Sequence, residues 1–161
     1  MITFPTGAYE VIQDQTPHVV RRLLGRDLGS IDEQGLLAIV RYNNLIAHFL
    51  QARVYHLKGH VRRSVAGVGQ AEVDDVHIAL PFDADEPVTI VPVEAKAKDE
   101  PVNRAQIAMQ ILYAREAFPG HLIRPLTIKL FSDGEILFME FEDEIRPAEL
   151  IPIAYARYLI E

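Results

Sequence analysis

Two apolar segments that lie close together in the chain, with a helix-forming segment after them, constrain the fold most. Residues 72–80 read EVDDVHIAL and residues 88–97 read VTIVPVEAKA, and both have the length and the apolar, β-branched content of strands. The acidic stretch PFDADEP (81–87) between them is rich in turn formers. Residues 103–118 consist of good helix formers and stop at a Pro-Gly pair. This order predicts an α/β fold in which a mixed β-sheet has helices packed on its faces.

Similar signals predict the other elements. Apolar residues recur at helical spacing after Ser30, so a helix is expected at about 31–50, with Ser30 as its N-cap and Glu33 as the capping-box partner. Pro92 lies inside a strand that otherwise reads as central, so a bulge or a local strand end is expected there. The remaining expected elements are a short helix at His18–Leu24, a hairpin of 52–57 and 61–68 around Lys58-Gly59, a hairpin of 126–131 and 135–141, and a helical turn from Pro147 followed by a strand at 155–160.

Composition narrows the class of protein. The chain has 161 residues and no linker or repeat divides it, which predicts a single domain over 1–161 with its core at about 31–131. It has no cysteine, so disulfides and thiolate chemistry are excluded. No apolar run approaches the roughly 18 residues that span a bilayer. A soluble, cytoplasmic protein that does not contact a membrane is expected.

Familiar cofactor and nucleophile motifs do not occur in the sequence. There is no G-x-G-x-x-G and no Walker loop, so no nucleotide cofactor is expected. There is no G-x-S-x-G, and no helix-turn-helix or zinc motif. Acyl-transfer hydrolases of those types, and recognition of a DNA sequence by a dedicated module, therefore find no support.

The acidic excess is concentrated in one part of the chain. The formal net charge is −7, and residues 72–100 hold nine acidic residues against two lysines. Residues 1–71 hold eight basic residues against five acidic ones. Acidic residues gathered in one segment can form a metal site, so the overall charge does not exclude nucleic acid as a partner.

Paired carboxylates and a lysine fall on the two central segments. Asp74 and Asp75 begin one strand, and Glu94-Ala95-Lys96 ends the next. Glu94 and Lys96 share a face because side chains alternate along a strand, so pairing of the two strands would bring an aspartate close to both. Two carboxylates and the Ala95 carbonyl are hard oxygen ligands for Mg²⁺ (or Mn²⁺), and Lys96 could hold a water or stabilise negative charge. The alternative is an ordinary surface ion pair between Glu94 and Lys96.

At these residues the sequence resembles the PD-(D/E)xK nuclease superfamily, which includes restriction endonucleases, junction resolvases and repair nucleases. The resemblance lies in VDDVHIAL, then IVPVEAKAK, then NRAQIAMQ, and it covers about residues 31–131. It implies a restriction-endonuclease-like mixed β-sheet flanked by helices. It also implies a Mg²⁺-dependent endonuclease that hydrolyses DNA phosphodiester bonds, often as a homodimer.

The resemblance also implies roles for particular residues. Asp74 or Asp75, with Glu94 and the Ala95 carbonyl, would be metal ligands, and Lys96 would be the catalytic lysine. The proline that the family pattern places before the aspartate is missing here, so the choice of aspartate stays open. Asp74 is favoured because it shares its face with three large apolar residues.

Two further residues match parts of the family pattern. Glu33 would be a metal ligand from the helix before the sheet, and Gln106 a catalytic residue on the helix after the lysine. The alternatives are that Glu33 caps its helix and that Gln106 is an ordinary polar residue at the surface. His77 is expected to be a packed or surface histidine.

A basic run with an aromatic residue precedes the acidic segment. RVYHLKGHVRR (53–63) contains Arg53, Lys58, Arg62 and Arg63 and no acidic residue, as expected of a hairpin that contacts nucleic-acid phosphates. The alternative is a solvated edge hairpin whose charges prevent aggregation.

Two functions other than catalysis fit the same features. The chain could be a non-catalytic module of the nuclease fold that binds nucleic acid or protein in a larger assembly. It could also be an unrelated α/β interaction protein whose acidic segment is a docking surface.

Overall fold

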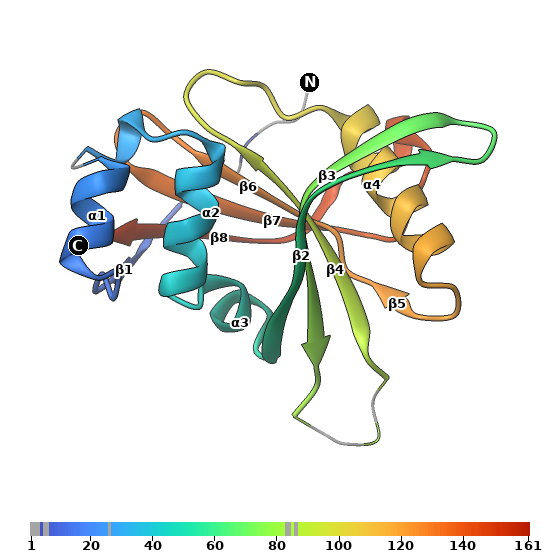
Figure 1. The fold of residues 1–161 in the computed structure, drawn as a ribbon, viewed down its shortest axis with the longest axis horizontal. Coiled ribbons are helices and arrows are strands. Elements are labelled where there is room, and N and C mark those ends of the chain that lie inside the picture. Colours follow the sequence, from blue (N-terminus) through green and yellow to red (C-terminus); the bar gives the residue numbers. More distant parts are fainter. Residues whose placement is uncertain (1–3, 5–6, 26, 83–84, 86) are drawn as a thin grey trace.

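The computed structural model describes residues 4, 7–25, 27–82, 85 and 87–161. Within them the chain forms an eight-stranded mixed sheet and four α-helices (Figure 1), so the expected α/β class is confirmed. The helices are α1 (His18–Leu24), α2 (Glu33–Tyr42), α3 (Leu45–Leu50) and α4 (Arg104–Ala117), and short 3-10 turns form at Leu28–Ser30 and Pro147–Glu149. The strands are β1 (Glu10–Ile12), β2 (Arg53–Val65), β3 (Gly69–Leu80), β4 (Thr89–Lys96), β5 (Leu122–Ile123), β6 (Leu126–Leu130), β7 (Glu135–Phe141) and β8 (Pro152–Ile160).

The sheet contains two antiparallel runs joined by a parallel pair, and β1 and β5 add parallel pairs with β8 and β4. Its order is β1-β8-β7-β6-β4-β3-β2, with β5 beside the start of β4. β2, β3 and β4 pair antiparallel, as do β6, β7 and β8, while β4 and β6 are parallel. A parallel pair needs a crossover connection, and α4 supplies it.

Helices cover both faces of the sheet. Val91, Val93 and Ala95 of β4 join the core packed under α2 and α3. Ile90 of the same strand joins the core packed under α4. Side chains alternate along β4, so Glu94 and Lys96 lie on the α4 face. Figure 1 shows α1, α2 and α3 grouped together and α4 apart from them.

The hairpin expected around Lys58-Gly59 is wrong. β2 runs through these residues as one long strand and pairs with β3 along its whole length, with Gly59 opposite Asp75. The register shifts between His56 and Lys58, and His60 has a positive φ of 49°. The chain thus forms an irregularity within a continuous strand where a turn was expected, because β2 can pair with β3 on both sides of it.

The single helix expected at 31–50 is also wrong. It divides at Asn44, whose φ of 50° and ψ of 38° are left-handed, a conformation that asparagine tolerates. The N-cap of α2 is Asp32, whose Oδ1 accepts a hydrogen bond of 2.8 Å from the Gly35 N–H. Ser30 does not form the capping box, because its hydroxyl donates to the Asp27 carbonyl at 2.8 Å.

Other elements match their prediction more closely. The α1 helix, the α4 helix, the β6–β7 hairpin and the helical turn after residue 146 are confirmed. The last strand starts earlier than expected, and β1 and β5 were not predicted. Pro92 pairs with Val76 without a register shift, so the expected bulge is wrong. On its other side the neighbouring strand is interrupted between β5 and β6, so the missing N–H falls beside a break in the sheet.

The acidic loop at 81–87 lies partly outside the described residues, namely at 83–84 and 86. None of the helices in the described chain combines the length and the apolar character that crossing a bilayer requires.

Candidate functional site

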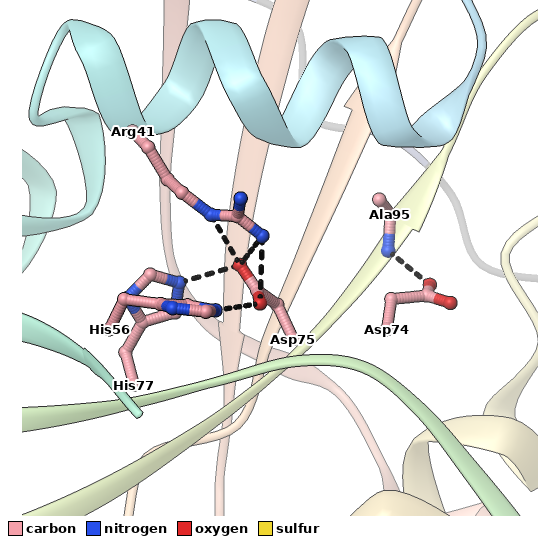
Figure 2. Close-up of polar contacts among 6 residues, drawn as sticks. All are labelled: Arg41, His56, Asp74, Asp75, His77 and Ala95. Carbon is pink, nitrogen blue, oxygen red and sulfur yellow. Dashed lines mark hydrogen bonds and ion pairs between the residues drawn. The ribbon is translucent and has the colours of Figure 1, made fainter. Parts of the chain in front are cut away.

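The candidate site lies where β3 and β4 diverge. Their last paired residues are Asp75 and Val93. Beyond that pair, Oδ2 of Asp74 accepts a hydrogen bond of 2.8 Å from the Ala95 N–H (Figure 2). The carboxylate takes the place of a carbonyl in the ladder, so it is held in position at the divergence of the two strands.

Glu94 and Lys96 lie beside this divergence on the α4 face. Glu94 is 6% exposed, and its Oε1 lies 3.5 Å from Nζ of Lys96. The other Glu94 oxygen, Oε2, is buried without a hydrogen-bond partner. Nζ of Lys96 also lies 3.6 Å from Oε2 of Glu100. A buried carboxylate oxygen without a donor is costly, and a cation or a proton would relieve that cost.

The carboxyl groups of the site hold their protons more tightly than ordinary carboxyls. Burial, together with the nearby Asp74 and Glu100, raises the pKa of Glu94 to about 7, although the charge of Lys96 opposes the increase. Burial also raises the pKa of Asp74, against the hydrogen bond from Ala95. A pKa near neutrality at a buried, charge-rich position is typical of functional carboxyls.

Glu33 adds a third carboxyl to this neighbourhood. It is the first residue of α2, and a hydrogen bond with the Glu100 carboxyl raises its pKa, as does burial. Its charge contributes to the raised pKa of Asp74. Glu33 therefore acts on Asp74 through its charge, and it interacts with Glu100, which in turn pairs with Lys96.

The residues present fit a hard divalent cation. In the part of the chain that the structure describes, no group of three or more His, Asp and Glu side chains is arranged to hold a metal ion. Mg²⁺ needs less than that, because it keeps several of its waters and binds through one or two carboxylates. Asp74, Glu94 and the Ala95 carbonyl supply oxygen donors, and the free Oε2 of Glu94 is suited to such a ligand.

Asp75 does not join this site. It is fully buried on the α2 side of β3, where Nη2 of Arg41 lies 3.0 Å from both of its oxygens. Nε2 of His56 lies 2.6 Å from Oδ1, and Nε2 of His77 lies 2.8 Å from Oδ2 (Figure 2). Although burial opposes it, these hydrogen bonds and the Arg41 charge hold the pKa of Asp75 below its ordinary value. Of the two aspartates, only Asp74 is near Glu94 and Lys96.

Gln106 is not drawn into the site either. It is exposed on α4 and makes no hydrogen bond with the described residues. Gln110, one turn later, is buried and donates to the Leu126 carbonyl at 3.3 Å. Gln110 thus ties α4 to the sheet.

The four basic residues of β2 are exposed, and three of them interact with neighbours. Arg62 lies 3.1 Å from Glu72, and Arg63 lies 3.7 Å from Glu116 of α4. Nζ of Lys58 lies 5.7 Å from the ring centroid of Phe118. Arg53 makes no ion pair with the described residues. The β2–β3 hairpin therefore rests against the C-terminal end of α4 (Figure 1), with its charges at the edge of the sheet.

Sequence reasoning missed Lys129 and Thr127 of β6. Nζ of Lys129 donates to the carbonyls of Lys98 at 2.8 Å and Glu100 at 2.5 Å, which fixes the segment that carries Glu100 toward Lys96. Thr127 is the register partner of Glu94, and its Oγ1 is also buried without a hydrogen bond. The sequence did contain a signal, because two polar residues lie on one face of the apolar segment LTIKL. Only the pairing of β6 with β4 shows that they lie beside Glu94 and Lys96.

Comparison of the chain with protein-family models, with curated proteins and with solved structures found no match.

Proposed function

We propose that this protein is a divalent-metal-dependent nuclease that hydrolyses DNA phosphodiester bonds, and that its fold is of the restriction-endonuclease-like type found in the PD-(D/E)xK superfamily. The observation that carries the proposal is the buried, unpartnered Oε2 of Glu94 beside Lys96, at the point where Asp74 is fixed between two diverging strands. The order of strand, E-x-K strand, helix and strand also agrees with that fold.

Asp74 and Glu94 would hold Mg²⁺ or Mn²⁺, with the Ala95 carbonyl as a further donor. When bound, the cation polarises a phosphoryl oxygen and lowers the pKa of a coordinated water. Asp74 is fixed by the Ala95 N–H, so its free oxygen keeps one orientation. Glu94 loses its proton more readily beside a cation, which offsets the effect of burial.

Lys96 would act on the phosphate or on the attacking water. Its ammonium lies between the carboxylates of Glu94 and Glu100, which direct it to the site. From there it can stabilise negative charge that develops on the phosphate. The basic side chains of β2, with Arg53 free of ion pairs to the described residues, would bind the DNA backbone.

Cleavage of supercoiled plasmid DNA tests the proposal. The wild-type protein should nick DNA with Mg²⁺ or Mn²⁺ and not with EDTA, and Lys96→Met should lower the rate by about 100-fold or more. Lys98→Met removes an exposed lysine two residues away and should cleave like the wild type. Equal cleavage by Lys96→Met and the wild type, or no cleavage with either metal, would contradict the proposal.

A non-catalytic nucleic-acid-binding module of the same fold is the second candidate. The ion pairs of Lys96 with Glu94 and Glu100 favour it, because they partly balance the site without a cation. This function predicts DNA binding that weakens steeply with salt and a thermal midpoint that Mg²⁺ does not change. The nuclease predicts that Mg²⁺ raises the midpoint of the wild type and not that of Glu94→Gln.

A further inference from the structure

A cavity of about 160 Å³ lies on the opposite side of β3 from the candidate nuclease site. Polar side chains from α2, the α2–α3 junction, β2 and β3 line one part of it, namely Arg41, Asn44, His56 and His77. The remaining walls are the aliphatic side chains of Val40, Ile46, Ala47 and Val54. The cavity thus combines a cationic side chain and polar side chains with aliphatic walls.

Asp75 does not line this cavity, but it orients three of the side chains that do. Its carboxylate only accepts hydrogen bonds, so Nε2 of His56 and Nε2 of His77 both carry their hydrogens toward it. Nε and Nη2 of Arg41 also donate to Asp75, whereas Nη1 makes no hydrogen bond with the described residues. Asp75 therefore holds three cationic or polar groups in place, and both of its own oxygens are occupied.

The backbone of β2 is adapted to this arrangement. A Cβ at Gly59 would come within 3.1 Å of Oδ1 of Asp75 and 3.7 Å of Nη2 of Arg41. Glycine inside a strand weakens the strand, and it commonly marks a close approach of backbone to another group. The strand accordingly carries glycine where the buried carboxylate needs space.

We propose that this cavity binds a small organic monocarboxylate. The ligand's carboxylate would accept hydrogen bonds from Nη1 of Arg41, because Asp75 already takes the Nε2–H groups of both histidines. Its short aliphatic or aromatic body would lie against the four aliphatic residues. A protein cavity of roughly 150 Å³ holds a benzene-sized molecule, which sets the size of the body. Free phosphate would leave the aliphatic walls without contact, and a nucleotide needs more volume. The proposal is independent of the nuclease site, because it uses none of Asp74, Glu94 and Lys96.

An NMR titration of the wild-type protein tests the chemistry of the ligand. Benzoate and butyrate should cause saturable shifts at the amides of Arg41, Asn44 and Ala47, and benzoate should raise the thermal midpoint. Benzyl alcohol, the neutral counterpart, should bind at least tenfold more weakly than benzoate. Equal binding of the alcohol, tighter binding of inorganic phosphate, or no saturable shift with either acid would overturn the proposal.

A cavity-filling variant tests whether the ligand binds in this cavity. Ala47→Leu puts three more carbons on a helical residue of the wall and touches no member of the Asp75 cluster, so it should weaken benzoate binding at least tenfold. Ala105→Leu makes the same change on the exposed surface of α4 and should bind like the wild type. Unchanged binding by Ala47→Leu would overturn the assignment.

Discussion

Asp74 and Asp75 show how strongly surroundings determine what a residue does. Both are aspartates on one strand, and burial raises the pKa of each. Asp74 accepts one backbone hydrogen bond and ends with a raised pKa. Asp75 is surrounded by Arg41, His56 and His77 and ends with a lowered pKa. The first would be a ligand of the proposed cation, and the second is ionised at neutral pH and structural.

Glu94→Gln should stabilise the protein above neutral pH. The unfolded Glu94 loses its proton near pH 4.5 and the folded one at about 7, so the folded state binds more protons between these values and stability falls as pH rises. Glutamine removes that loss, which should increase the free energy of unfolding by up to roughly 3 kcal/mol at alkaline pH. Below pH 4 the two proteins should be nearly equal. Urea unfolding across this range measures the difference.

Glu142→Gln is the matched control for that measurement, because Glu142 is exposed and carries the same functional group. Its stability should follow the wild type at every pH. A Glu94→Gln protein no more stable than the wild type at alkaline pH would show that the buried carboxylate is not destabilising in the folded protein.

Asp75→Asn should have the opposite effect on stability. The amide cannot balance the charge of Arg41 or accept from all three partners, so the loss should be about 3 kcal/mol or more. In the wild type, the stability from Asp75 is complete above its ordinary pKa near 3.8 and is lost as pH falls through the lowered folded value. Asp99→Asn, at an exposed aspartate, should unfold like the wild type. Equal stability of Asp75→Asn and the wild type would argue against the cluster.

At the scale of elements, prediction from sequence failed where contacts with residues distant in the chain determine the local structure. The central strands, α4 and the β6–β7 hairpin were predicted because their apolar pattern agrees with their burial. Lys58-Gly59 has turn chemistry, but pairing with β3 keeps the chain extended. The break at Asn44 was missed because a left-handed residue leaves the apolar periodicity of α2 and α3 largely intact.

The start of α2 gives a test at this scale. Asp32→Ala removes the acceptor for the Gly35 N–H and should cost about 1 kcal/mol of unfolding free energy. Ser30→Ala should cost less, because Ser30 lies before the cap and its hydroxyl donates to the Asp27 carbonyl. Chemical denaturation of both variants measures this order. The reverse order would restore Ser30 as the cap.

At the scale of the whole molecule, acidic residues are concentrated in 72–100, and the segment before it has an excess of basic residues. Prediction from sequence placed Asp74, Glu94 and Lys96 together because adjacent strands in sequence usually pair. It could not place Lys129 or the Arg41–Asp75 ion pair, because these depend on how β6 and α2 dock on the sheet. The local sequence pattern was thus enough to predict the residues at the centre of the candidate site. The residues around that centre could be identified only from the three-dimensional fold.

DNA affinity should depend on salt through the basic edge formed by β2. Replacing Arg53, Lys58, Arg62 and Arg63 with glutamine should weaken binding and reduce the slope of log affinity against log salt by about 0.9 for each phosphate that the variant no longer neutralises. Fluorescence anisotropy with duplex DNA measures both. Arg146→Gln, at an exposed arginine paired with Glu144, should leave the slope unchanged. An unchanged slope in the fourfold variant would exclude β2 as the DNA-binding edge.

The adjacency of Asp74 and Asp75 on β3 has a consequence for how this gene can change. Side chains alternate along a strand, so inserting or deleting one codon just before these residues, with the preceding part of β3 kept in register, would exchange the faces on which they lie. The carboxylate bonded to Arg41 would then turn toward the face of Glu94, and the one bonded to Ala95 would turn toward the face of Arg41 and His56. Substitutions can accumulate in β3 one at a time, but length changes there should be rejected, and a library of single-codon indels would show β3 as a stretch without survivors.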